Sequence, residues 1–161
     1  MAIDFKYNNQ YKEPLSSHPM DYKIYLIEAK YHLAVAERLM KGYKEYPEKR
    51  FLVGVISELA KALSKLIHAV LIKEDFVKNG ADAFFKKIAP KYLEETIRIN
   101  LMKIIEVAKA QRASPIEFTK GDNIILLIHG KYRFLTVDRI REFMKSTKDA
   151  ILTFSTTFRQ I

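Results

Sequence analysis

Residues 48–74 are the part of this chain that most constrains its fold. On a helical wheel, at about 100° per residue, the polar side chains between residues 50 and 68 fall within one arc of about 120°. They are Arg50, Ser57, Glu58, Lys61, Ser64, Lys65 and His68. The rest of the circumference is mainly Val, Leu, Ile, Ala and Phe. We therefore predict a long, largely buried central helix with one narrow polar stripe.

Three further segments have the apolar period of a long helix. They are residues 20–42, 92–112 and 137–158. Gly42 and Pro47 are expected to end the first of them, and Thr136 is expected to cap the last. A short helix over about residues 81–88, closed by Pro90, is predicted between the long ones. The pattern predicts a mainly α fold, a four-helix-bundle-like domain with a short extra helix.

The period changes from helical to strand-like at about residues 115–135. Two glycine-containing turns, Gly121-Asp122-Asn123 and Gly130-Lys131, interrupt the β-rich runs of this segment. We predict a small antiparallel β-hairpin or meander inserted before the last helix. The side chains expected to pack it against the helices are Phe118, Ile125, Leu127 and Phe134.

The chain divides into an arm and one domain. Residues 1–19 have no sustained period and contain Pro14 and Pro19, so we expect an N-terminal arm. Residues 20–161 are expected to form a single helical domain, because they contain no internal repeat, low-complexity tract or linker.

The chain is strongly basic and lacks cysteine. Its 28 Lys and Arg against 19 Asp and Glu give a net charge of +9, which favours polyanionic partners such as RNA. The alternative is a lysine-rich surface that only keeps the protein in solution. The absence of Cys excludes disulfides, thiolate metal sites and cysteine nucleophiles. No signal-peptide pattern or apolar run of about 20 residues is present, so we expect a cytoplasmic protein with no membrane partner.

The first two predicted helices resemble the opening pair of HEPN domains. The likeness is carried by AKYHLAVAERLM at residues 29–40 and by the apolar helix that follows. The segment SPIEFTKGDNIILLIHGKYRFLTVDRIREFM, residues 114–144, is similar to the tail of uncharacterised archaeal proteins with such a helical core. The resemblance implies a small four-helix bundle, often dimeric, of a kind that cleaves RNA, binds nucleotides or partners a nucleotidyltransferase.

The ribonuclease branch of that family carries an Arg followed four to six residues later by a His. No Arg of this chain precedes a His at that spacing. We therefore predict a non-catalytic RNA- or nucleotide-binding or regulatory module that forms a homodimer and uses no cofactor. The dimer is also suggested by the wide apolar circumference of residues 48–74. The alternatives are a ribonuclease or nucleotide-processing enzyme with an unrecognised site, and a structural dimerisation subunit.

The sequence HGKYR at residues 129–133 is the candidate nucleic-acid site. Tyr132 is suited to stacking on a base, Lys131 and Arg133 are suited to binding phosphate, and His129 lies beside them. The alternative is a solvated turn with the aromatic side chain in the core. A broader electropositive surface is also expected from Lys86, Lys87 and Lys91 together with Lys41, Lys44, Lys49 and Arg50.

The polar stripe supplies the other candidates. Glu58, Lys61 and His68 form a possible catalytic set, and the alternative is that they only mark the solvated side of a helix. Glu28 and His32 are four residues apart on the first helix. If the first two helices are antiparallel, this pair would converge with Glu58 and His68 on a zinc or manganese site. Otherwise it is an ordinary surface pair, and we expect no metal.

Overall fold

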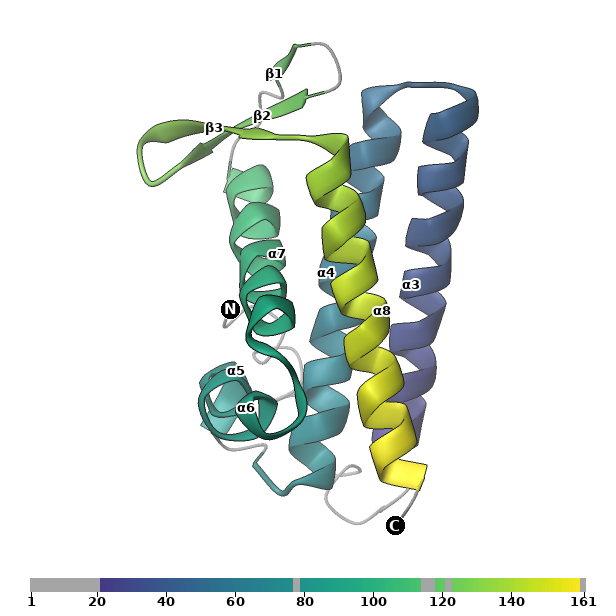
Figure 1. Cartoon of the computed structure of the whole chain (residues 1–161), viewed down its shortest axis with the longest axis vertical. Helices are drawn as coiled ribbons and strands as arrows, with labels where there is room; N and C mark the ends of the chain where they lie inside the picture. Colours follow the sequence, from purple (N-terminus) through teal and green to yellow (C-terminus); the bar gives the residue numbers. More distant parts are fainter. Residues whose placement is uncertain (1–20, 77–78, 114–117, 121–122, 160–161) are drawn as a thin grey trace.

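The computed structural model describes residues 21–76, 79–113, 118–120 and 123–159. Four long helices lie side by side as a bundle (Figure 1). They are α3 (Asp21–Glu45), α4 (Lys49–Lys73), α7 (Glu95–Ala113) and α8 (Val137–Arg159). The predicted mainly α fold is confirmed, whereas the N-terminal arm lies outside the described residues. Among the described helices, none combines the length and the apolarity needed to cross a bilayer.

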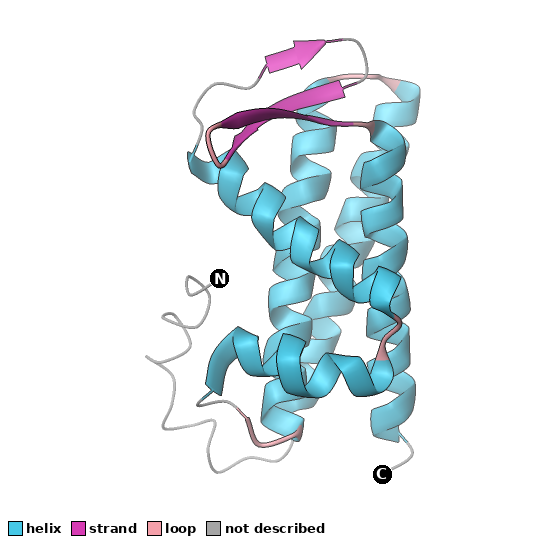
Figure 2. Ribbon diagram, turned by 60° about the vertical axis from the view of Figure 1, so that its left-hand side comes forward, coloured by secondary structure: helices cyan, strands magenta, loops and turns pink. Residues whose placement is uncertain are grey.

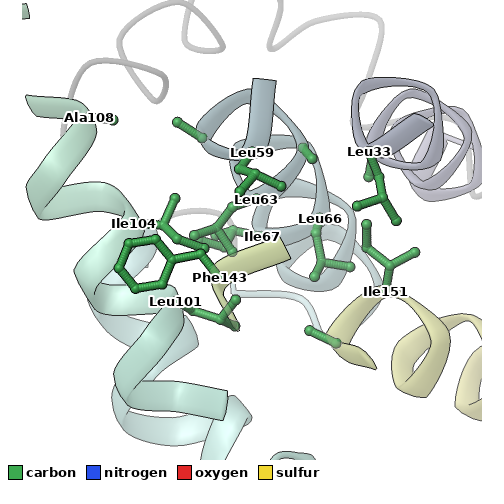
Figure 3. Close-up of a cluster of buried hydrophobic side chains, with 14 of the residues drawn as sticks. Leu33, Leu59, Leu63, Leu66, Ile67, Leu101, Ile104, Ala108, Phe143 and Ile151 are labelled. Carbon is green, nitrogen blue, oxygen red and sulfur yellow. The ribbon is translucent and has the colours of Figure 1, made fainter. Parts of the chain in front are cut away.

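Helix α4 is the central helix of the bundle. It packs against α3, α7 and α8, and its Leu59, Leu63 and Leu66 are fully buried. These side chains lie in one cluster with side chains of the other three helices (Figure 3). Burying a leucine side chain contributes about 1.5–3 kcal/mol. The apolar circumference of α4 is thus covered within one chain, so it gives no argument for a second copy.

The prediction that Gly42 ends the first helix was wrong, because α3 continues to Glu45. Gly42 lies against the next helix instead: a Cβ atom at this position would be 3.1 Å from the ring of Phe51. Gly54 on α4 has the same role, since its Cβ would be 2.9 Å from Cδ1 of Leu39. Both glycines therefore allow the close approach of α3 and α4 rather than a helix end.

Residues 80–92 form one helical segment that follows the C-terminal end of α4. It consists of α5 (Gly80–Ala83), the π-helical turn η3 (Phe84–Ile88) and α6 (Ala89–Tyr92). Phe84 is fully buried, and its ring centroid lies 5.9 Å from that of Phe154 on α8. Pro90 does not close the segment as predicted but lies in the first turn of α6, where a missing N–H costs little.

A three-stranded antiparallel sheet precedes α8, as predicted. Its strands are β1 (Phe118–Lys120), β2 (Asn123–Ile128) and β3 (Lys131–Leu135), in the order β1-β2-β3. The sheet lies across one end of the bundle (Figure 2). His129 and Gly130 connect β2 to β3 with φ angles of 50° and 75°, the signs of a type I′ hairpin turn. The Gly121-Asp122 part of the other predicted turn lies outside the described residues.

The face of the sheet that packs on the helices is the opposite of the predicted one. Ile124, Leu126 and Leu135 are buried, whereas Leu127 is 45% exposed and Phe134 is 63% exposed. Successive side chains of a strand point to opposite faces, so a shift of one residue exchanges the buried and exposed sets. All five residues from 124 to 128 are apolar, and their pattern therefore does not indicate which set is buried. The side chain of Phe118 lies outside the described part of the chain.

Candidate functional site

The β2–β3 hairpin presents an apolar, aromatic face to solvent. We call it the outer face and define it by Ile125, Leu127, Tyr132 and Phe134. Tyr132 is 66% exposed and Phe134 63%, and they share a face because they are two residues apart on one strand. Leu127 lies opposite Tyr132, and Ile125 lies opposite Phe134. The interpretation that placed Tyr132 in the core was wrong.

Strand β3 is also an edge of the sheet. A two-residue turn makes Ile128 and Lys131 a hydrogen-bonded pair, and hydrogen-bonded pairs alternate along an antiparallel ladder. The backbone N–H and C=O groups of Tyr132 and Phe134 therefore point away from β2, toward the open edge. This edge adds backbone donors and acceptors to the aromatic surface beside it.

Two cations alternate with the aromatic residues of β3. Lys131 and Arg133 are exposed, as are Tyr132 and Phe134, so both faces of this part of the strand reach solvent. Arg133 lies opposite the buried Leu126. Its side chain therefore leaves the strand on the face turned toward the bundle, and its length lets the guanidinium reach the edge. Lys131, Tyr132 and Arg133 are thus consecutive on one edge strand, with Tyr132 on the outer face and the two cations leaving the strand on the opposite face.

His129 occupies the tip of the hairpin. Its Nε2 atom lies 3.9 Å from Oε1 of Glu106 on α7, and its side chain is largely exposed. Helix α7 packs against β2. His129 therefore lies near α7 at the tip of the hairpin, and it is not part of the outer face.

The sheet end of the bundle carries further cations. The connection between α3 and α4 lies at this end, whereas α5 and α6 lie at the other (Figure 1). The prediction of one electropositive surface was therefore wrong, because its two parts belong to opposite ends. The residues near the sheet end are Lys41, Lys44, Lys49 and Arg50, of which Arg50 pairs with Glu48 at 2.7 Å.

The polar stripe of α4 is bonded to α3. The Nδ1 atom of His32 lies 2.6 Å from Oε2 of Glu58, and Nζ of Lys61 donates to Oε1 of Glu58 at 3.3 Å. The two helices are antiparallel neighbours, as the predicted convergence of His32 and Glu58 requires. The carboxylate of Glu58 therefore has one partner across the helix pair, His32 of α3, and one on its own helix, Lys61.

A second set of contacts follows further along the same stripe. Nζ of Lys65 lies 3.0 Å from Oε2 of Glu28 and 5.4 Å from the ring centroid of Tyr25. The ring of Tyr25 meets His68 edge to face, with centroids 4.2 Å apart. His68 is only 2% exposed, so it is not on the solvated side of the helix. The pKa of His68 is lowered to about 4, mainly by burial and also by the charge of Lys65, while the charge of Glu28 opposes the shift.

These contacts define the chemistry that the stripe can support. Glu58 and Lys61 touch, but His68 lies ten residues further along α4, which is about 15 Å. The three candidate catalytic residues therefore do not form one site. Glu28 and His32 each face a different partner on α4. Within the described ranges, no three His, Asp or Glu side chains are grouped so that they could hold a metal ion.

Comparisons of the chain with protein-family models, curated proteins and solved structures gave no match. The resemblance to HEPN domains therefore stays a prediction. The candidate interface depends only on the geometry of the hairpin, the charge of its edge and the exposure of its rings.

Proposed function

We propose that this protein is a non-catalytic RNA-binding module whose contact surface is the outer face and the open edge of the β2–β3 hairpin. The observation that carries the proposal is the exposure of Tyr132 and Phe134 on one face, with Lys131 and Arg133 alternating between them. Each base stacked on an aromatic side chain contributes about 1–3 kcal/mol. Lys and Arg bind phosphate and position the strand.

The charges of β3 argue against pairing of its open edge with the β3 strand of a second copy. Open edge strands pair readily with other strands, and charged side chains discourage that pairing. In a β3–β3 pair, Lys131 and Arg133 of one copy would lie near those of the other, and opposed like charges destabilise a sheet. A polyanion has the opposite effect, because it neutralises both cations. The same edge thus disfavours a second copy and favours RNA.

The charge of the whole chain supports the same partner. The net charge is +9, and the cations of the α3–α4 connection lie at the end of the bundle that carries the sheet (Figure 1). A basic surface raises the local concentration of a polyanion and its association rate. Binding is therefore expected to weaken as salt is added.

The binding test uses fluorescence anisotropy of a labelled single-stranded RNA. Replacing both rings, Tyr132→Ala with Phe134→Ala, is expected to weaken binding at least tenfold, since two stacking contacts of about 1–3 kcal/mol each are lost. The matched control is Lys86→Ala with Lys87→Ala, at the other end of the bundle, which is expected to change binding less than about threefold. Equal losses in both double variants would contradict the proposal.

The contacts of the polar stripe support the non-catalytic part of the proposal. Glu58 is bonded to His32 and Lys61, and His68 is buried about 15 Å away along the helix. An enzyme built on this set would need all three groups within reach of one reacting atom. The test is incubation of labelled RNA with the protein, followed by sizing of the products. Cleavage that is lost in Glu58→Gln would support the enzyme instead.

A different surface favours the alternative of a dimerisation subunit. Ile24, Ile27 and Tyr31 are 53%, 66% and 62% exposed on one face of α3, at a spacing typical of a helix–helix seam. Ala34 continues that face with a side chain small enough to let a second copy of α3 approach. Light scattering at several concentrations tests this homodimer. A strict monomer contradicts it, and a dimer that Ile27→Glu dissociates supports it.

A further inference from the structure

We infer that the outer face binds a single strand with at least two adjacent unpaired bases, rather than a duplex or a free mononucleotide. The inference rests on the proposed RNA-binding function and adds the class of RNA. It follows from the spacing of the two rings, from the side chains opposite them and from the position of Arg133.

The spacing of the rings decides between stacked and unstacked bases. Tyr132 and Phe134 are two residues apart on an extended strand, so their Cα atoms are about 6.6 Å apart. Neighbouring bases stacked in one strand of a duplex are about 3.4 Å apart. Two adjacent bases can therefore each lie on one of the rings only if they no longer stack on each other. That condition is met by an unpaired strand and not by a duplex.

Each ring has its own aliphatic neighbour on β2. Tyr132 lies opposite Leu127, and Phe134 lies opposite Ile125. Both are non-hydrogen-bonded pairs, whose side chains approach most closely, with Cβ atoms about 4.5–5.5 Å apart. The outer face is thus divided into two similar apolar positions, each large enough for the face of one base. A mononucleotide would occupy one position, whereas a strand would occupy both.

Arg133 lies between the two rings in the sequence and at the edge of the sheet. Two adjacent nucleotides share one phosphate between them. A strand whose bases lie on Tyr132 and Phe134 would bring that phosphate to the level of Arg133, whose planar guanidinium matches phosphate oxygens. The N–H groups that point to the open edge provide further donors. A duplex hides the faces of its bases and leaves both rings unused.

The experiment compares four probes at one salt concentration by competition against a labelled single strand. The probes are hexauridylate, the dinucleotide UpU, UMP and a blunt RNA duplex of six base pairs. Hexauridylate and UpU are expected to compete, and UMP and the duplex are expected to be at least about tenfold weaker. Equal competition by UMP or by the duplex would overturn the inference.

The variant Phe134→Leu separates stacking from loss of the fold. It keeps an apolar side chain at this exposed position but removes the ring. Phe134→Leu is expected to weaken the binding of hexauridylate about fivefold or more. The binding of UMP should change less, because UMP can use the position at Tyr132. An unchanged thermal midpoint in Phe134→Leu shows that the fold is retained. Equal weakening of hexauridylate and UMP by Phe134→Leu would contradict the two-position arrangement.

The same measurements distinguish an error in the class of RNA from an error in the proposed RNA-binding function. If no probe binds, or if Tyr132→Ala with Phe134→Ala leaves the binding of hexauridylate unchanged, the proposed function is wrong and the inference falls with it. If all four probes bind equally and this double variant weakens all of them equally, the outer face binds RNA but does not select a single strand.

Discussion

The imidazole of His32 and the carboxylate of Glu58 join α3 to α4, with Nδ1 and Oε2 2.6 Å apart. Both side chains are largely shielded from solvent, at 20% and 17% exposure. A hydrogen bond to a charged group contributes about 1.5–3 kcal/mol when it is shielded in this way. The polar stripe is therefore a structural connection between the two helices, in addition to being the polar side of α4.

Replacing His32 tests this connection. His32→Ala is expected to lower the free energy of unfolding by about 1–3 kcal/mol, because Glu58 keeps only Lys61 as a partner. Urea denaturation of both single variants and of His32→Ala with Glu58→Gln gives the coupling energy. The matched control is the exposed pair of Arg139 and Glu142 on α8, for which about 0.2–1 kcal/mol is expected. A coupling no larger than that of the control argues against the connection.

His68 is expected to make the stability depend on pH. Its pKa is about 4 in the folded chain, against 6.5 for an ordinary histidine, so the unfolded chain binds the proton more readily between these values. The free energy of unfolding should therefore be fully retained above pH 6.5. It should fall as the pH drops toward about 4, by about 3 kcal/mol in total.

The variant His68→Phe isolates this contribution, because it keeps an aromatic ring against Tyr25 and removes the titrating group. Urea denaturation between pH 7 and pH 4.5 is expected to show a smaller loss of stability in His68→Phe than in the wild type. His129→Gln, at the exposed hairpin tip, is the control and should leave the pH dependence unchanged. If the wild type and His68→Phe lose stability in parallel, the buried ring does not cause the effect.

The register of the sheet can be tested with two neighbouring leucines. Leu126 is buried, and Leu127 is 45% exposed on the outer face. Leu126→Ala is expected to lower the free energy of unfolding by about 2–5 kcal/mol, because it leaves a cavity. Leu127→Ala should lower it by about 0.5 kcal/mol or less. Chemical denaturation measures both, and the reverse order would restore the register expected from the sequence.

The edge cations should determine part of the salt dependence of RNA binding. Each phosphate contact on a single strand contributes about −0.7 to the slope of the logarithm of the binding constant against the logarithm of salt concentration. Replacing both Lys131 and Arg133 by Ala is expected to reduce the magnitude of that slope by about 1.4. Anisotropy titrations at several salt concentrations measure it. The control variant, Lys86→Ala with Lys87→Ala, should keep the wild-type slope if the edge of β3 is the phosphate site. An equal change of slope in the two double variants would contradict this assignment.

The helical part of the fold was predictable because its signals are local. The apolar circumference of α4 indicated a central helix, and that helix is buried as expected. Thr136 was predicted to cap the last helix, and its Oγ1 accepts a hydrogen bond from the backbone N–H of Arg139 at 3.1 Å. Helix caps and helical periods depend on residues within a few positions of each other, so both can be recognised from the sequence alone.

The positions that were predicted wrongly depend on contacts between distant parts of the chain. Glycine is a common residue at the end of a helix, but Gly42 instead lies against Phe51 of the next helix. His68 lies within the polar arc of α4, but Tyr25 of α3 covers it. In β2, the apolar run of residues 124–128 fits either register. In the structure, the buried Leu135 pairs with Ile124. These two residues therefore belong to the face of the sheet that packs on the helices.

The candidate site was predicted in part. Lys131, Tyr132 and Arg133 were chosen from their residue types and lie together on the edge. Phe134 was expected to help pack the sheet against the helices, but it is 63% exposed. Its exposure follows from the register, which places it on the same face as Tyr132 and turns that face away from the bundle.

The most direct test of the account is the affinity of a single-stranded RNA for the wild type and for the variant with Tyr132→Ala and Phe134→Ala, measured by anisotropy at one salt concentration. We expect salt-sensitive binding by the wild type and a loss of at least about tenfold in the variant, with the thermal midpoint retained. Absence of binding by the wild type, or equal affinity of the two proteins, would contradict it.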